Sequence, residues 1–201
     1  MGAPIIGEVP TEAWEYFEKA QHSTLNPVIK ARYADLRWEG LQTYQDAESA
    51  IDSYAEASQV YLESFLREDE PRIGIALVDA LLRSLELAAC INNQERLFEC
   101  HEITLSIAEK LITSGKPRWA YDLVWGLIEN RKARDLSDLN QLKRFAEKAV
   151  QIYREGAPVH DLWERKWLGL LEKCCHLQHD QDATNAAQRA IAEIGAKATL
   201  H

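Results

Sequence analysis

The sequence predicts an all-α fold built from helical hairpins that stack on one another. Apolar residues recur at helical spacing through nearly the whole chain. Glycine and proline are scarce, with 9 and 6 among 201 residues, which disfavours a sheet protein with many tight turns. The helices also fall into pairs that recur about every 45 residues, a pattern typical of helical solenoids.

The helices can be assigned in order along the chain. A short helix is expected over residues 11–20, within an N-terminal segment and linker that covers residues 1–25. Asn26 is a candidate N-cap, and Pro27 suits a first helical position. The predicted helix pairs that follow are 27–44 with 47–66, 71–91 with 94–114, 117–132 with 138–155, and 161–178 with 181–197.

Residues that begin or end helices separate these elements. Pro71 and Pro117 suit the first position of a helix, and Gly115 suits a C-terminal cap. Further caps or breaks are expected at Ser137, Gly156, Asp161 and Asp180. The predicted connections are short, which favours antiparallel neighbours.

The period is longer than the roughly 34 residues of a tetratricopeptide repeat. We therefore predict a tetratricopeptide-like but irregular α-solenoid of about four helix pairs plus the short N-terminal helix. It forms a single all-helical, repeat-like domain over residues 1–201. The segment ASQVY at Ala57–Tyr61 echoes AVQIY at Ala149–Tyr153, two periods later. A single helical bundle is the alternative architecture.

The most apolar segment is Ile73–Ile91, which contains Asp79, Arg83 and Glu86. Charged groups are costly in lipid, so a buried helix of a water-soluble protein fits better than a membrane span. Arg83 is expected to pair with both acids on one partly buried helix face. The N-terminus has no secretion signal, so a cytoplasmic location with reduced cysteines is expected.

The formal net charge of −9 makes nucleic acid an unlikely partner, because phosphate binding requires a basic surface. Basic residues exceed acidic ones only locally, within residues 116–154. If those side chains share one face, the chain would instead be a nucleic-acid-linked module. A solvated helix face is the other explanation of this excess.

The segment LEKCCHLQHDQDAT at Leu171–Thr184 raises the question of a metal site. On a helix, Cys175 and His179 would share a face, but no second pair of ligands with suitable spacing exists. We therefore expect no metal, with Cys175 and His179 as a weak alternative. No nucleophile–base pair, phosphate loop or dinucleotide fingerprint is readable, so no catalytic residue or cofactor is predicted.

The segment ARYADLRWE at Ala31–Glu39 resembles a motif of an uncharacterised bacterial family, in the N-terminal helical-repeat region of its members. The segments AIDSYAEASQVYLES and ALLRSLELA lie where that family has its next two helices. The resemblance covers the first half of the chain. It implies either an N-terminal module of a longer protein, whose downstream region is related to HEPN ribonuclease-like bundles, or a free-standing relative of such a module. Those bundles use an Arg and a His on one helix, whereas here Arg154–His160 crosses Gly156 and Pro158, so no catalytic role is carried over.

The function predicted from these features is a non-catalytic protein-interaction or regulatory module. Its partner would be another polypeptide, a downstream domain, or a second copy of the chain, and not a membrane. The expected contacts are large aromatic and Arg side chains on helices that line a solenoid groove. The residues assigned to this role are Arg37, Trp38, Arg83, Trp119 and Trp167, with burial in the helical core as the alternative for each tryptophan.

Overall fold

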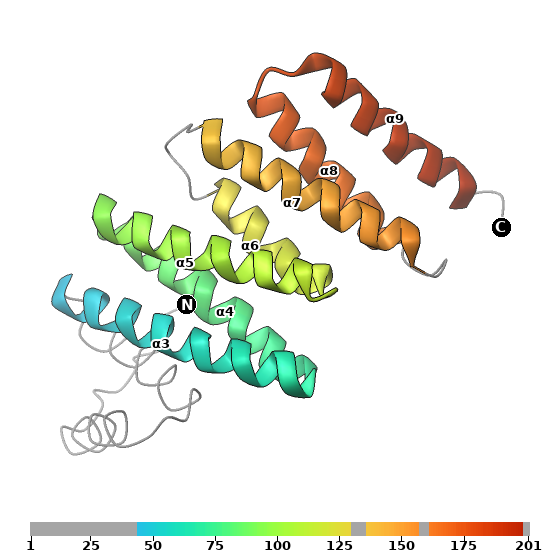
Figure 1. Ribbon diagram of the computed structural model, residues 1–201. Coiled ribbons are helices and arrows are strands. Elements are labelled where there is room, and N and C mark those ends of the chain that lie inside the picture. The colour runs from blue at the N-terminus through green and yellow to red at the C-terminus, as the bar shows by residue number, and fades with distance from the viewer. Residues whose placement is uncertain (1–43, 130–135, 157–160, 199–201) are drawn as a thin grey trace, which may run out of the picture. The chain divides into compact units, whose positions relative to one another are not determined.

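The computed structural model describes residues 44–129, 136–156 and 161–198 (Figure 1). Regular structure in these ranges is entirely α-helical, which confirms the predicted fold class. The helices are α3 (Tyr44–Glu68), α4 (Pro71–Cys90), α5 (Gln94–Thr113), α6 (Pro117–Glu129), α7 (Leu136–Glu155), α8 (Asp161–Leu177) and α9 (Gln181–Ala198). Apart from Tyr44, the predicted helices 11–20 and 27–44 lie outside the described residues.

The chain divides into two compact units, residues 1–104 and 105–201. The division falls within α5, so that helix contributes its first half to one unit and its second half to the other. Because each hairpin of a repeat array contacts mainly its neighbours, such an array can divide in this way without a linker. The single repeat-like domain over residues 1–201 stays a prediction.

The core of the first unit forms where α3 packs against α4. The apolar stripe of α3 is buried, with Phe65 completely inside. On α4, Leu77, Leu81 and Leu85 recur every four residues and are equally inaccessible. Burying side chains of this size contributes about 1.5–3 kcal/mol each, so this interface stabilises the unit substantially.

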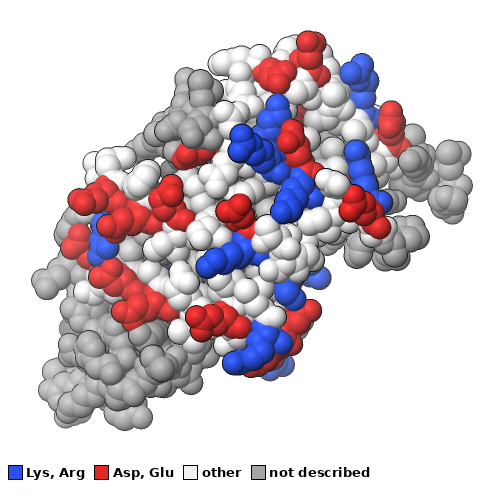
Figure 2. Space-filling view, in the orientation of Figure 1, with Lys and Arg blue, Asp and Glu red and all other residues white. Residues whose placement is uncertain are grey.

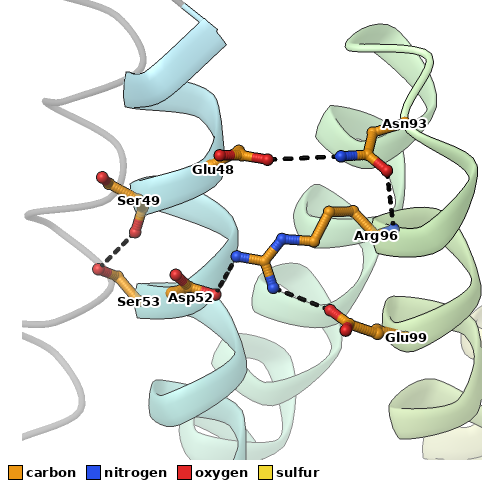
Figure 3. A network of polar contacts seen from close by, with 7 residues as sticks. All are labelled: Glu48, Ser49, Asp52, Ser53, Asn93, Arg96 and Glu99. Carbon is orange, nitrogen blue, oxygen red and sulfur yellow. Dashed lines mark hydrogen bonds and ion pairs between the residues drawn. The ribbon is translucent and has the colours of Figure 1, made fainter.

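A polar network joins α3 to the start of α5 (Figure 3). The Arg96 guanidinium donates to Asp52 on α3 over 2.7 Å and to Glu99 on its own helix over 2.8 Å. Beside it, the Asn93 side chain donates to Glu48 over 3.4 Å and accepts from the Arg96 backbone N–H over 3.2 Å. Asn93 therefore caps α5 and also attaches it to α3.

The second unit is also built from helices that pack against one another. Helix α8 packs against both α7 and α9, and α6 contacts α7 and α8 (Figure 1). The core is formed by residues such as Leu123, Leu127, Leu142 and Leu170, none of which has exposed surface. Trp167 is also completely buried.

Most helices begin or end at the residues that the sequence marked as helix termini. Pro71, Pro117 and Asp161 begin α4, α6 and α8 as predicted. Gly115 has a φ of 74° and ends α5, where the Lys116 N–H donates to the Leu111 carbonyl over 2.8 Å. This is the predicted glycine cap. Helix α7 begins at Leu136, one residue before Ser137, the position at which the sequence predicted a cap.

Two charged residues of α4 pair as predicted but are more exposed than predicted. Arg83 donates to Asp79 over 3.0 Å, as its spacing predicted. The side chains are 44% and 61% exposed, however, so the pair is solvated and not partly buried. Among the described helices, none combines the length and apolarity needed to cross a bilayer.

Candidate functional site on helices α6 and α8

Helix α6 has two different faces. One carries apolar side chains that face the core, and the other carries aromatic and basic side chains. Leu123, Val124 and Leu127 face the core and are completely buried. Arg118, Tyr121 and Trp125 follow each other at spacings of three and four residues, which places them on a common face. Trp125 is 39% exposed, an unusual position for so large an apolar side chain.

Helix α8 supplies the second half of the site. Trp163 and Lys166 are three residues apart and share a face, and Lys173 lies two turns further along. Trp163 is half-buried, and Lys166 is exposed. We call Arg118, Tyr121, Trp125, Trp163, Lys166 and Lys173 the aromatic–cationic surface.

Tyr121 is the centre of the aromatic part. Its ring lies 6.4 Å from Trp125 with an interplanar angle of 22°, an offset stack. It meets Trp163 at 5.9 Å and Trp167 at 5.4 Å, both nearly perpendicular. Edge-to-face and offset contacts of this kind contribute about 0.5–1.5 kcal/mol each beyond area burial. The rings therefore fix α6 against α8 while part of the cluster stays accessible.

Three cations lie over these rings. Lys166 Nζ is 4.3 Å from the centre of the Trp163 ring and 5.4 Å from that of Tyr121. The Arg118 guanidinium is 5.5 Å from both Trp119 and Trp163. Lys173 Nζ is 4.1 Å from the Trp125 ring and also forms an ion pair with Glu129. Ring quadrupoles attract cations in this geometry, so the side chains are held in place.

The cations differ in whether a carboxylate neutralises them. Lys173 is paired with Glu129. Within the ranges that the structure describes, Arg118 and Lys166 form no ion pair, and each lies over two aromatic rings. Their N–H groups are therefore available to an acidic partner, and Trp163 lies beneath both of them.

The phenols beside these cations stay neutral. Burial raises the pKa of Tyr121, and the carboxylate of Asp122 acts in the same direction. Burial raises the pKa of Tyr153 on α7 to about 12, although the positive charge of Arg118 acts to lower it. Both hydroxyl groups are consequently protonated near neutral pH and do not neutralise the cations.

The structure places the predicted contact residues in different environments. Trp119 is half-buried beside Arg118, at the edge of the aromatic–cationic surface. Trp167 is 0% exposed, so it is a core residue and its assignment as a groove contact was wrong. Arg83 lies in the first unit and is exposed. Arg37 and Trp38 lie outside the described residues.

Tyr121, Trp125 and Lys166 were not among the contacts predicted from the sequence. A signal was present, because Tyr121 and Trp125 are four residues apart and Trp163 and Lys166 are three apart. The nucleic-acid alternative depended on whether the basic side chains within residues 116–154 share one face, among them Arg118, Arg131, Lys132 and Arg134. The last three lie outside the described residues.

The backbone does not place Cys175 and His179 on one helix, as the weak metal alternative assumed. Helix α8 ends at Leu177, and His179 has a φ of 59°, in the turn that follows. The Asp180 N–H donates to the Cys175 carbonyl over 3.0 Å, which closes this turn. Cys175 and His179 therefore do not share a helical face. Among the described residues, no three His, Cys, Asp or Glu side chains are grouped so that they could hold a metal ion.

Comparisons with known proteins gave two results. A family model matches the first half of the chain, and solved structures share its helical fold. Residues 5–99 match the model of a family described as Domain of unknown function (DUF7380). The match includes the ARYADLRWE segment and confirms the predicted resemblance to an uncharacterised family. The DUF7380 match also includes the Asp52–Arg96–Glu99 network, whereas the aromatic–cationic surface lies beyond it.

Solved structures similar to the chain are helical-repeat proteins. The DHF58 filament has a TM-score of 0.53 at 16% identity, over 91% of each chain. The de novo designed helical repeat protein DHR64 has a TM-score of 0.50 at 16% identity, over 92% of this chain and 94% of its own. No curated protein sequence matches the chain. The fold that continues past the DUF7380 match is thus that of a helical repeat.

Proposed function

We propose that the chain is a non-catalytic interaction module that binds an acidic polypeptide segment at the aromatic–cationic surface. One observation carries the proposal: Arg118 and Lys166 lie over Trp163 without a carboxylate partner in the described structure. Trp, Tyr and Arg are the residues that most often dominate binding energy at protein interfaces. Here they occur together on two adjacent helices.

The chemistry of the surface favours Asp and Glu side chains in the partner. An Arg guanidinium donates two parallel hydrogen bonds to a carboxylate, and a Lys ammonium acts as a point charge. Contact with the rings already restricts Arg118 and Lys166, so less side-chain entropy is lost when a partner binds. The exposed edge of Trp125 offers apolar area beside these charges.

A polypeptide fits this surface better than a nucleic acid does. Proteins that bind single strands stack bases on open aromatic faces and follow the backbone with many cations. Here Lys166 and Lys173 lie over the faces of Trp163 and Trp125. The chain also has a net charge of −9, and acidic side chains gather over α3 and the first half of α5 (Figure 2). Such groups repel a nucleic acid, which carries a phosphate at every nucleotide, more strongly than a short polypeptide segment with a few carboxylates.

The proposal assigns this binding to the cytoplasm. Its support is the state of the cysteines, because Cys90, Cys100, Cys174 and Cys175 are all free. Free cysteines in such number are typical of a reducing compartment. The acidic segment belongs to another polypeptide or to a further region of the same protein. The surface would recognise both by the same chemistry.

Site-directed photo-crosslinking tests the proposal in the cells that make the protein. We would place p-benzoylphenylalanine at position 125, on the surface, or at position 98, where Phe98 is 61% exposed in the first unit. The proposal expects a crosslink from position 125 to a polypeptide, with the attachment site in an acidic segment. The position 98 protein is the matched control and should not give that product.

A charge reversal makes the experiment specific. Lys166→Glu should abolish the position 125 crosslink, because it repels the acidic segment. Arg165→Glu makes the same charge change at the neighbouring exposed residue and should leave the crosslink intact. A crosslink to nucleic acid, or one that survives Lys166→Glu, would contradict the proposal.

A further inference from the structure

A pocket of about 350 Å³ opens in the second unit, between the end of α5 and the middle of α7. It is separate from the aromatic–cationic surface and shares no residue with it. Ile112 and Phe145 form apolar parts of its wall, and both are almost completely buried. The volume is at the lower end of the range of small-molecule sites, which is about 300–1,000 Å³. A ligand of this pocket is therefore small.

Two cations of α7 line the same pocket. Arg144 and Lys148 are exposed and four residues apart, and basic side chains are visible over α7 in Figure 2. In the described parts of the chain, neither side chain has a hydrogen bond or an ion pair. Like charges at this spacing destabilise a helix by about 0.2–0.5 kcal/mol. The helix thus presents two positive charges that no carboxylate of the described chain neutralises.

The wall of the pocket that α5 forms carries a negative charge. Glu109 of α5 lines the pocket but forms no ion pair with Arg144 or Lys148. The Gln141 amide lies on the α7 side and supplies neutral donors and an acceptor. An anionic ligand would be repelled by Glu109 and attracted to α7, which fixes its orientation in the pocket.

We infer that this pocket binds a small monocarboxylate with an apolar body. The carboxylate lies against Arg144 and Lys148, with Gln141 as a further donor. The apolar body lies on Ile112 and Phe145. This site shares no residue with the aromatic–cationic surface. An experiment can therefore refute either binding proposal without affecting the other.

The probe is N-acetyl-leucine, which has one carboxylate and an apolar side chain. Its control is N-acetyl-leucinamide, which has the same body without the charge. Each would be titrated into the full ¹⁵N-labelled chain, with the side-chain N–H signals of Gln141 and Arg144 followed by NMR. We expect saturable shifts at these signals with the acid, and binding of the amide weaker by about tenfold or more, as loss of a charge-assisted contact implies.

Variants with opposite expected effects make the test specific. Arg144→Gln should weaken binding of the acid about tenfold, and Lys148→Gln, a second surface change, should also weaken it. Glu109→Gln should strengthen binding about twofold or more, because it removes a repulsive charge. Arg165→Gln, on α8, is the matched control and should change nothing. Equal binding of acid and amide, weaker binding in Glu109→Gln, or shifts that do not include Gln141 and Arg144 would overturn the inference.

Discussion

Lys166 Nζ lies 4.3 Å from the centre of the Trp163 ring, three residues earlier on the same helix. The next residue, Trp167, is completely buried. One turn of α8 therefore places one indole in the core and another beneath a solvent-exposed cation. The same turn contributes to stability and to the surface that we propose for binding.

Truncation of the two kinds of tryptophan should separate these contributions. Trp167→Ala removes a completely buried ring and should lower the free energy of unfolding by about 3–5 kcal/mol. Trp125→Ala removes a partly exposed ring and its contacts with Tyr121 and Lys173, so we expect a loss of about 1 kcal/mol. Urea unfolding of both variants measures the difference. Equal losses would show that Trp125 belongs to the core.

The sequence was sufficient to predict the helices that the structure describes, because their signals are local. Apolar periodicity, Pro71, Pro117 and Gly115 each act within one or two turns, and the observed helix ends follow them closely. The burial of a given face depends on neighbours that are distant in sequence. For that reason Arg83 was expected to be partly buried, and Trp167 was expected to be accessible. The structure reverses both expectations.

Arg83 and Arg96 should differ in their effect on stability. Arg83 pairs with Asp79 on one exposed helix face, so Arg83→Ala should cost less than about 1 kcal/mol. Arg96 is only 25% exposed and links two helices through Asp52, so Arg96→Ala should cost more, about 1–2 kcal/mol. Thermal or urea unfolding of the two variants provides the comparison. A larger loss for Arg83→Ala would mean that its face is covered.

The stability of the α8–α9 turn should depend on pH through Asp180. Its carboxylate accepts the Ala183 backbone N–H over 3.1 Å and lies 3.3 Å from Lys143 Nζ. These contacts lower the pKa of Asp180, the backbone hydrogen bond first. A carboxyl group with a lowered folded-state pKa stabilises the fold above its ordinary pKa of about 3.9. This contribution is lost as the pH falls through the lowered folded-state value.

An Asp180→Asn protein isolates this effect, because asparagine also caps helices but does not ionise. The wild type should be more stable than the variant near neutral pH. The difference between them should shrink as the pH falls below about 4. Urea midpoints at several pH values would test this. A difference that is constant with pH would exclude a role of the charge.

The cysteines should react with alkylating reagents at very different rates. Burial raises the pKa of Cys100 to about 11 and that of Cys174 to about 12. Cys90 is exposed, and it should be modified first in the native chain. Only thiolates react readily, so Cys100, Cys174 and the third buried thiol, Cys175, should stay protected until unfolding. Mass spectrometry after brief alkylation near pH 8 measures the order. Rapid modification of Cys174 would contradict the buried position of this thiol.

The candidate surface was only partly predictable, for a physical reason. The sequence indicated that α6 and α8 carry the aromatic side chains, and Trp119 does lie at the edge of the surface. The pairing of Arg118 with Trp163 joins residues of different helices and depends on how those helices pack. No local pattern encodes that contact. In the same way, the metal alternative depended on an unbroken helix through His179, which a positive φ interrupts.

The measurement that tests the central claim most directly is a comparison of two labelled polymers by fluorescence anisotropy. One is a peptide of alternating Glu and Tyr residues, and the other is a single-stranded RNA with the same number of negative charges. We expect the peptide to bind more tightly, with an affinity that falls as salt rises. Arg118→Ala with Lys166→Ala should weaken its binding by about tenfold or more, whereas Arg165→Ala with Arg189→Ala should not. RNA that binds as tightly as the peptide, or equal peptide binding by the two double variants, would contradict an acidic-polypeptide site on α6 and α8.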